Sequence, residues 1–308
     1  MIYTITFNPS LDDVIFVEDF EIGKTNRSYS EKMFPGGKGF NVSTILHRLG
    51  LETTALGFVA GFTGKEIERQ LKERGFACDL IDLEEGFSRI NIKMKGKQET
   101  EINGSGPVIP KEKTAQLMAK IKEMKKDDWL VLAGSIPSSL SNDTYAQMMA
   151  LVEAKGIRVV VDATGELLLK TLVWHPFLIK PNRDELEEIF GYSIPDAKTL
   201  ISAARKLQAM GAENVLVSLG SKGAMLVSQD GKIYQCPAAN GILKNSVGSG
   251  DSMVAGFIAG YMKSGCYDEA LRLGSACGGA TAFSEDLAQK ELIDQVYETL
   301  QAEEIRYA

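Results

Sequence analysis

A glycine-rich turn followed by a single carboxylate is the feature of the chain that could most plainly do chemistry. Residues 245–260 read NSVGSGDSMVAGFIAG, so Asp251 comes directly after Gly248-Ser249-Gly250 and precedes small and apolar residues. Two interpretations are open. Gly and Ser are common N-caps, and an acid in the first turn complements the helix dipole, so the stretch is typical of an ordinary helix start. The same turn would also present backbone N–H groups to a phosphate.

A second glycine-rich turn occurs nearer the N-terminus. Residues 34–43 read FPGGKGFNVS, and Gly37 would let the backbone approach a ligand closely. Lys38 and Asn41 follow one helical turn apart, and therefore lie on one face of the expected helix. The alternative is a tight turn that only leads into that helix.

Two further turns follow strand-like segments. FLIKPNRDEL, residues 177–186, spaces Asn182 and Glu185 either as an N-cap with an acid at N3 or as oxygen ligands of a hydrated Mg²⁺ ion. SLGSKGA, residues 218–224, indicates by itself only a turn. Because open α/β sheets bind ligands at the carboxyl ends of their strands, these turns together favour a binding site.

The sequence lacks two common nucleotide-binding motifs. GFTGK at residues 61–65 lacks the first glycine of a Walker A motif at the required spacing, and Glu66 follows it. No G-x-G-x-x-G lies between a first strand and a first helix. A dinucleotide-binding oxidoreductase is therefore a disfavoured α/β alternative.

Composition limits the class of protein. The 308 residues, 44% of them hydrophobic, can bury a core as one large domain or as one domain with an appendage. The net charge of −7 argues against binding nucleic acid or an anionic membrane, so a phosphorylated substrate would need a few placed cations. The two histidines, His47 and His175, are far apart in the sequence, so a zinc site or a Ser-His-Asp triad is poorly supplied.

The cysteines and the N-terminus indicate the compartment. Cys78, Cys236, Cys266 and Cys277 have no metal-type spacing and are expected to be buried thiols of a reducing compartment. The N-terminus lacks the pattern of a signal peptide, and no apolar run reaches about 18 residues. We therefore expect a cytoplasmic protein without membrane segments.

Alternating strands and helices must position the four turns. Short runs rich in β-branched residues predict strands at residues 2–8, 129–135, 157–163, 176–182 and 214–220. Apolar residues at helical spacing predict a helix over 38–49, and Thr63 with Glu66 predicts a capping box for a helix over 63–75. Strands separated by helices indicate an α/β fold with a parallel sheet covered on both faces.

Two segments interrupt this alternation and predict a small β flap. Residues 11–35 and 87–106 show no helical period, and the second alternates Ile90, Ile92 and Met94 with polar residues. A flap with one apolar face either covers a site or pairs with another copy.

Taken together, the motifs resemble those of the ribokinase-like PfkB family of carbohydrate kinases. The resemblance runs from TFNPSLD at residues 6–12 to ATAFSED at residues 280–286, and includes GGKGFN, KPNRDEL, SLGSKGA and VGSGDSMVAG. Within the family, NPSLD, SRINIK, TEINGSGP and LAGSIPSSL are most similar to 1-phosphofructokinases and next to tagatose-6-phosphate kinases. The resemblance implies one three-layer α/β/α domain over residues 1–308, with a mostly parallel central sheet, a β lid, and transfer of the γ-phosphoryl group of MgATP to a sugar hydroxyl.

The resemblance also implies roles for the first turn. Asp251 matches the catalytic base, and Gly248-Ser249-Gly250 matches the anion hole, with Ser249 standing where the family usually has alanine. Because a helix N-terminus lowers a carboxylate pKa, we expect Asp251 to be always ionised and a weak base, which suffices for a loose transition state. The small residues Ala255, Gly256, Ala259 and Gly260 are expected to let the helix pack tightly against the sheet.

The other site residues follow by position in the motifs. Asp12, whose motif is expected at the end of the first strand, is implied to face the sugar together with Gly37, Lys38 and Asn41. Those implied to hold its existing phosphate are Arg89 and Asn91, assisted by Lys24, Arg27 and Ser135. Those implied to face the nucleotide phosphates and magnesium are Lys180, Asn182 and Glu185, and those implied to line the nucleotide are Ser218, Gly220, Ser221, Gly223 and, on the adenine side, Val247. For Arg89 the alternative is a solvated surface arginine. The resemblance leaves open whether a monovalent cation also activates.

The leading hypothesis is an ATP-dependent 1-phosphofructokinase that makes fructose 1,6-bisphosphate. The alternatives are a tagatose-6-phosphate kinase, a kinase of nucleosides or unphosphorylated sugars, and a catalytically silent sugar-phosphate sensor, which the intact Asp251 disfavours. The apolar face of the flap predicts a homodimer joined lid to lid, with the hairpin also closing over the sugar.

Overall fold

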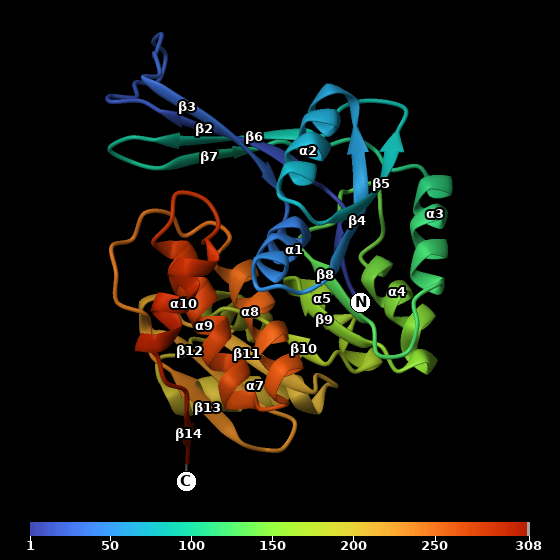
Figure 1. Cartoon of the computed structure of the whole chain (residues 1–308), viewed down its shortest axis with the longest axis vertical. Coiled ribbons are helices and arrows are strands. Elements are labelled where there is room, and N and C mark those ends of the chain that lie inside the picture. Colours follow the sequence, from blue (N-terminus) through green and yellow to red (C-terminus); the bar gives the residue numbers. More distant parts are fainter. Residues whose placement is uncertain (307–308) are drawn as a thin grey trace.

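The computed structural model describes residues 1–306 and contains a large sheet between helices, with a smaller sheet projecting from it (Figure 1). In spatial order, the strands of the large sheet are β14 (Glu303–Ile305), β13 (Ile233–Cys236), β12 (Ala224–Val227), β11 (Asn214–Ser218), β10 (Leu178–Ile179), β9 (Arg158–Asp162), β8 (Trp129–Ala133), β1 (Ile2–Thr6), β4 (Thr53–Ala60) and β5 (Ala77–Leu83). The strands from β11 to β5 in this order are parallel, and β12, β13 and β14 extend the sheet with antiparallel pairs. The predicted α/β fold with a mostly parallel sheet is confirmed.

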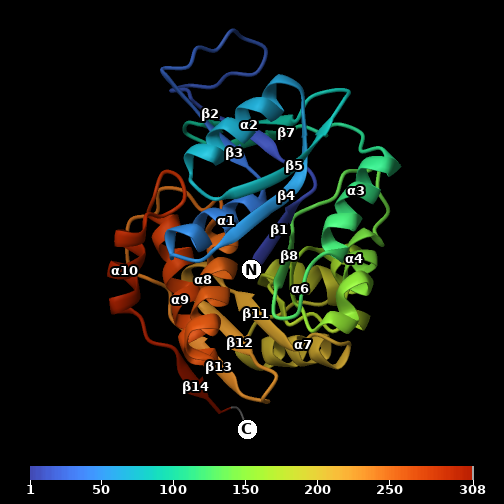
Figure 2. The same ribbon diagram turned by 45° about the vertical axis from the view of Figure 1, so that its right-hand side comes forward.

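The sheet is buried on both faces. Along β8, Leu130 and Leu132 pack into one apolar cluster while Trp129 and Val131 pack into another, as the alternation of side chains in a strand requires. Figure 2 shows α1, α8, α9 and α10 on one side of the sheet and α3, α4 and α7 on the other. The helices are α1 (Lys38–Arg48), α2 (Gly61–Glu73), α3 (Lys111–Lys122), α4 (Thr144–Val152), α5 (Gly165–Leu169), α6 (Arg183–Phe190), α7 (Ala197–Ala209), α8 (Ser249–Ser264), α9 (Tyr267–Ala282) and α10 (Lys290–Thr299).

The five predicted strands occur as β1, β8, β9, β10 and β11, but the capping box predicted for the second helix is wrong. Helix α2 begins two residues earlier, after Ala60, and Thr63 lies inside it with its hydroxyl donating to the Ser88 carbonyl oxygen at 2.7 Å. Glu66 pairs instead with Arg69 at 2.6 Å. Ser88, from the segment that leads into the small sheet, binds the backbone N–H and carbonyl of Ala60, so a tertiary contact fixes this helix start.

The small sheet consists of the two segments that interrupt the alternation. Its strand order is β3 (Ser30–Gly36), β2 (Ser10–Phe16), β6 (Arg89–Lys95) and β7 (Thr100–Asn103), and β6 and β7 form the hairpin predicted within residues 87–106. In Figure 1 this sheet projects at the upper left, beyond α1 and above α8, α9 and α10. We call it the lid.

Gly256 and Gly260 of helix α8 face the neighbouring helix α9 and not the sheet. A Cβ atom at Gly256 would lie 2.6 Å from the Leu273 carbonyl oxygen, and one at Gly260 would lie 2.8 Å from Cα of Ala270. The prediction that these glycines serve sheet packing is therefore wrong, because the face of α8 that carries them meets its neighbouring helix.

The cysteines are free, as expected, but not uniformly buried. Cys236 and Cys277 are buried, Cys78 is half-buried, and Cys266 is exposed just before α9. Within residues 1–306, no helix combines the length and the apolar character needed to cross a membrane.

Candidate active site

Three charged side chains meet at the carboxyl edge of the parallel sheet. Strands β9 and β10 pair in register, so Asp162 at the end of β9 and Lys180 just after β10 leave the sheet side by side. The Oδ1 atom of Asp162 lies 3.4 Å from Nζ of Lys180 and 3.3 Å from Nζ of Lys38, the first residue of α1. Asp162 is 1% exposed. Although burial alone would raise its pKa, the two ammonium groups hold the pKa of Asp162 below its usual value, so it is ionised.

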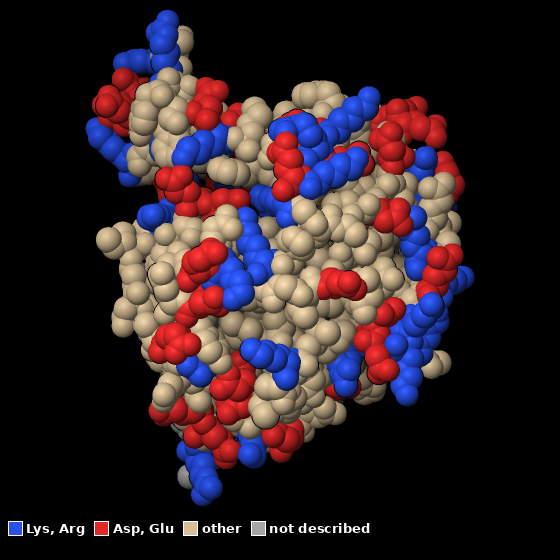
Figure 3. Space-filling view, in the orientation of Figure 1, with Lys and Arg blue, Asp and Glu red and all other residues tan. Residues whose placement is uncertain are grey.

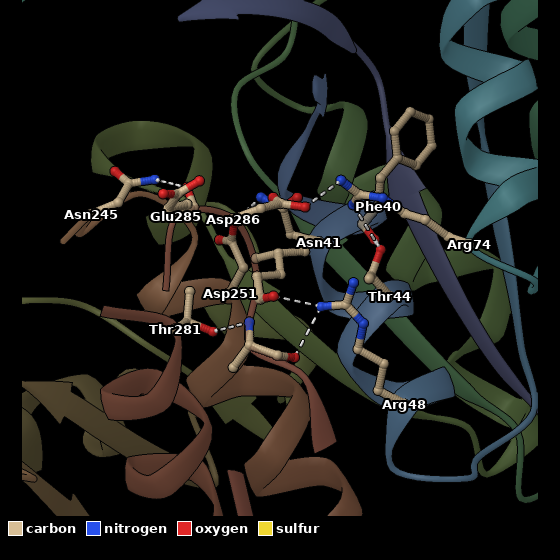
Figure 4. A network of polar contacts seen from close by, with 12 residues as sticks. Phe40, Asn41, Thr44, Arg48, Arg74, Asn245, Asp251, Thr281, Glu285 and Asp286 are labelled. Carbon is tan, nitrogen blue, oxygen red and sulfur yellow. Dashed lines mark hydrogen bonds and ion pairs between the residues drawn. The ribbon is translucent and has the colours of Figure 1, made fainter. Parts of the chain in front are cut away.

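Asp251 faces this cluster from the first turn of α8. It is buried, and its Oδ2 atom accepts a hydrogen bond of 2.8 Å from Nδ2 of Asn41, which lies one helical turn after Lys38 (Figure 4). Burial, and then the negative charge of Asp162, raise the pKa of Asp251 to about 6, although Lys38 and the Asn41 hydrogen bond oppose the rise. The expectation of a lowered pKa is therefore wrong, because loss of water outweighs the helix dipole at this position. Asp251 is a stronger base than predicted.

The turn before Asp251 has the geometry of an anion site. Gly248 caps α8 in the left-handed conformation, with φ of 79°, and the helix begins at Ser249. The N–H of Ser249 donates to the Ser246 carbonyl oxygen at 3.3 Å, whereas those of Gly250 and Asp251 belong to the first turn and have no intrahelical acceptor. A Cβ atom at Gly250 would lie 3.1 Å from the Lys180 ammonium, so glycine leaves room for a ligand atom between this turn and a cation.

Asn182 and Glu185 form a reciprocal capping box at the start of α6. The Asn182 side chain accepts from the Glu185 N–H, and the Glu185 carboxylate accepts from the Asn182 N–H, both at 2.8 Å. The N-cap interpretation is therefore confirmed for both residues. Among residues 1–306, no group of three acidic, histidine or cysteine side chains is arranged to hold a metal ion. These residues fit only a largely hydrated Mg²⁺ ion, in keeping with the preference of that ion for retained waters and substrate phosphates.

The predicted nucleotide loop lies next to that capping box. Ser218, at the end of β11, pairs with Asn182 in a parallel bridge, so the loops after β10 and β11 are adjacent. Gly220 to Lys222 form a single 3₁₀ turn. Gly223 has φ of 88°, and a Cβ atom there would lie 2.1 Å from the Cys236 carbonyl oxygen, so the approach of β13 already requires glycine. The structure thus places Ser218, Gly220, Ser221 and Gly223 at the same edge of the sheet as Lys180.

Asp12 lies in lid strand β2 and not, as its motif suggested, at the end of the first strand. Its Oδ1 atom accepts hydrogen bonds from Asn91 at 2.9 Å and Ser10 at 2.6 Å, and its Oδ2 atom pairs with the Lys93 ammonium at 2.9 Å. Asn91 also accepts from the Gly104 N–H, so its amide is held in place with one N–H directed to Asp12.

A cavity of about 410 Å³ separates the inner face of the lid from the body of the protein. In Figure 3 the surface is indented below the lid, and both acidic and basic side chains border the indentation. The residues that line the cavity include Asp12, Asn41, Lys32, Lys93, Lys95, Lys244, Val247, Glu285, Asp286 and Leu287. Val247 therefore lies with the sugar-facing residues, and its contact with adenine stays a prediction. Four lysines and three acidic residues line this cavity, and Lys32, Lys93 and Lys95 are each paired with a carboxylate.

Arg89 and Ser135 line a second, smaller cavity. It has a volume of about 120 Å³ and also exposes Gly37 and Lys38, so it adjoins the charged cluster. The Arg89 Nε atom donates to the Asn8 carbonyl oxygen at 3.0 Å, and burial lowers the pKa of the guanidinium, which excludes a freely solvated surface arginine. Lys24 lies elsewhere, in the exposed β2–β3 loop, where it pairs with Glu21. It lines neither cavity, and neither does Arg27.

Sequence reasoning missed Asp162 and Lys93. Asp162 directly follows the apolar run VVV, the same position after a strand that drew attention to Lys180 and Ser218. Lys93 belongs to the alternating hairpin, of which only the apolar residues were considered. Both could have been found from their places in the sequence, but their partners could not.

The chain is similar to known carbohydrate kinases over nearly its whole length. A family model described as pfkB family carbohydrate kinase matches residues 6–291. A 1-phosphofructokinase of Bacillus subtilis is 45% identical over 96% of this chain and 97% of the relative, and a D-tagatose-1-phosphate kinase of Bacillus licheniformis is 36% identical over 98% and 99%. The crystal structure of Escherichia coli phosphofructokinase-2 in complex with substrates and products has a TM-score of 0.92 at 25% identity, covering 97% of this chain and 98% of that one.

The chain belongs to the pfkB family of carbohydrate kinases. It is therefore a phosphotransferase with an alcohol acceptor, and its fold is ribokinase-like, as the resemblance implied.

The raised pKa of Asp251 predicts an acid limb in the pH profile. Because a base must be ionised, kcat/KM should fall by about tenfold per unit below an apparent pKa near 6 and level off above pH 7. Initial rates from pH 5 to 9 at subsaturating sugar phosphate would measure this. A profile that stays flat down to pH 5 would contradict the assignment of Asp251 as the base.

The same pKa predicts that Asp251 destabilises the folded protein at high pH. Its folded-state pKa of about 6 exceeds the unfolded value of 3.8, so the folded protein favours the protonated form. Stability is therefore lost as pH rises through about 6, by roughly 2–3 kcal/mol. Asp251→Asn should raise the free energy of unfolding at pH 8 and change it little at pH 4, as urea unfolding at both values would show. Equal free energies of unfolding for the wild type and the variant at pH 8 would mean that the buried Asp251 carboxylate does not destabilise the folded protein.

Proposed function

We propose that this chain is an ATP-dependent kinase that phosphorylates fructose 1-phosphate to fructose 1,6-bisphosphate. The observation that carries the proposal is Asp251, a buried carboxylate of raised pKa behind an anion-binding turn and beside two lysines. The choice of sugar phosphate is supported by the 45% identity to a relative named 1-phosphofructokinase.

The residues divide the transfer reaction between them. Asp251 accepts the proton of the substrate hydroxyl as that oxygen forms a bond to the γ-phosphorus and the bond from phosphorus to the ADP oxygen breaks. The N–H groups of Gly250 and Asp251 and the buried ammonium group of Lys180 stabilise the charge on the transferred group. Asp12, held by three donors, orients the sugar hydroxyls. A bound Mg²⁺ ion, reached through water by Glu185, would neutralise phosphate charge.

A second substrate is supported by a specific comparison. The relative that is 36% identical is named D-tagatose-1-phosphate kinase, so tagatose phosphates are the alternative acceptors. A coupled assay of ADP release over fructose 1-phosphate, fructose 6-phosphate, tagatose 1-phosphate, tagatose 6-phosphate and free sugars tests both. The highest kcat/KM should be for fructose 1-phosphate. No ADP release with any acceptor would instead favour a silent sugar-phosphate sensor.

Replacing the base should separate catalysis from binding. Asp251→Asn keeps the size of the side chain but removes its proton affinity, so kcat should fall by on the order of 10²–10⁴ while both KM values stay within a few-fold. Steady-state kinetics with both substrates measure this. Turnover close to that of the wild type would reject Asp251 as the base.

Arg89 should contribute to sugar phosphate binding and not to ATP binding. A charge-assisted contact from the half-buried guanidinium is worth roughly 1.5–3 kcal/mol, so Arg89→Ala should raise KM for the sugar phosphate about 10- to 150-fold. Lys24→Ala, in the exposed β2–β3 loop, is the matched removal of a cation. A rise in KM for ATP in the Arg89 variant would mean that this cavity holds the nucleotide.

The lid supports a homodimer as the assembly. In the register of the sheet, Met33, Asp13, Ile92 and Ile102 lie in one row across all four lid strands. This row is on the face opposite Asn91 and Lys93, which are buried towards the cavity, and Met33 and Ile102 are about half exposed. Apart from Asp13, this row is apolar and turned away from the cavity, so it needs cover, and a second copy supplies a matching face through a two-fold axis.

The dimer has a direct test in solution. Burial of each aliphatic side chain is worth roughly 1.5–3 kcal/mol, so Ile92→Asp should dissociate the dimer. Sedimentation of both proteins, with and without MgATP and sugar phosphate, measures the state, and Ile22→Asp in the exposed β2–β3 loop controls for added charge. A wild type that sediments as a monomer at micromolar concentration would leave the lid as a cover for one chain only.

A further inference from the structure

Residues 285–288 lie in the connection between α9 and α10. They form part of the cavity wall beside the anion-binding turn. Its residues Glu285, Asp286 and Leu287 line the cavity beneath the lid. Leu287 reaches the turn itself, since a Cβ atom at Gly248 would lie 2.7 Å from Cδ2 of Leu287. A displacement of this segment would therefore move the cap of α8.

A threonine ties the end of the segment to the helix that carries the base. Thr281 Oγ1 accepts from the Ala288 N–H at 3.2 Å and shares a hydrogen bond of 2.8 Å with the hydroxyl of Ser252, which follows Asp251. The segment is thus connected to the start of α8 by apolar contact at one point and by hydrogen bonds at another.

Two arginines, at the ends of α1 and α2, bind the segment (Figure 4). Arg48, the last residue of α1, donates from Nη1 to the carbonyl oxygens of Leu287 at 2.7 Å and Ala288 at 2.9 Å. Arg74, at the end of α2, pairs with Asp286 at 3.1 Å and donates to the Thr44 hydroxyl at 3.1 Å. Neither arginine touches the cavity where the substrates are expected.

These arginines are costly to keep in place. Burial lowers the pKa of both guanidinium groups, Asp286 opposes this in both, and the charge of Arg74 lowers the pKa of Arg48 further. Arginine nevertheless stays protonated in proteins, so two like charges are held close together and partly out of water. The compensation is a rigid set of charge-assisted bonds to one short segment, including two from a single guanidinium nitrogen to successive carbonyl groups.

We propose that Arg48, supported by Arg74, is a positioning residue for phosphoryl transfer. It fixes residues 285–288 so that Leu287 holds Gly248, and with it the N–H groups of Gly250 and Asp251, in line with the transferred group. Helix α1 then positions the site from both ends, because Lys38 and Asn41 lie at its start and Arg48 at its end. This inference rests on the proposed kinase function of the same site.

The test separates positioning from a purely structural role. Because a misplacement of about 1 Å can cost on the order of 10²-fold in rate, Arg48→Ala should lower kcat by roughly 10- to 100-fold. Both KM values should change far less than kcat, within about threefold, since Arg48 itself does not line the cavities where the substrates are expected to bind. Guanidinium chloride at low millimolar concentration should restore part of the lost kcat, and Arg48→Lys should retain more activity than Arg48→Ala.

A second variant and a control complete the design. Leu287→Ala keeps the carbonyl groups that Arg48 binds but removes the side chain at Gly248, so it should lower kcat similarly, and the double variant should be little worse than either. Arg272→Ala is the matched control, because Arg272 donates at 3.2 Å to the Tyr297 carbonyl oxygen between α9 and α10, away from residues 285–288. Its kcat should stay near that of the wild type.

The inference is overturned if folded Arg48→Ala retains kcat within about twofold, if only KM rises, or if guanidinium fails to restore turnover. If the two substitutions lowered kcat additively in the double variant, Arg48 would not act through Leu287. If Arg48→Ala does not fold, the Leu287→Ala and Arg48→Lys results decide. A wild type that releases no ADP with any acceptor would reject the proposed function itself, which is a different outcome from an active wild type with unaffected variants.

Discussion

A carboxylate removed from water is stable only when positive charge is close to it, and Asp162 meets that requirement with two lysines. The cluster exists because β9 and β10 are parallel and in register, which releases Asp162 and Lys180 at one edge, and because α1 begins where Lys38 can reach the same oxygen atom. The rest of the site depends on this arrangement. It raises the pKa of the Lys38 ammonium and contributes to the raised pKa of Asp251.

The protein as a whole is acidic, so anion binding depends on a few positively charged groups placed at the site. Lys38, Lys180 and Lys93 are each paired with an aspartate, so the site in this state carries compensated charge. The N–H groups at the start of α8 add partial positive charge that no side chain neutralises. Such a site attracts a phosphate by placement at short range and not by a long-range field.

The two faces of the lid differ in composition and in what they are expected to contact. The face that carries Asp12, Asn91 and Lys93 is turned to the cavity. Asn91 and Lys93 both bind Asp12, and Val14, Phe16 and Phe34 add apolar lining on the same face. The opposite face carries Ile92 and Ile102 and is turned away from it. Because successive residues of a strand point to opposite sides, one short hairpin can contribute both to substrate binding and to association.

Local patterns in the sequence determined most of the architecture. Strand runs, helical periodicity and the hairpin alternation predicted β1, β8 to β11, α1 and the lid, because backbone conformation and burial of one face are set by nearby residues. The glycine turns also pointed to Asp251, Lys38 and Asn41 as candidate site residues, and the end of a strand pointed to Lys180. Tertiary structure decided the rest. The start of α2 depends on Ser88, the pKa of Asp251 depends on burial and on Asp162, and the partners of Arg48 lie more than two hundred residues away. Charge, burial and hydrogen bonding between distant segments have no period and no fixed spacing, so only the folded chain could supply them.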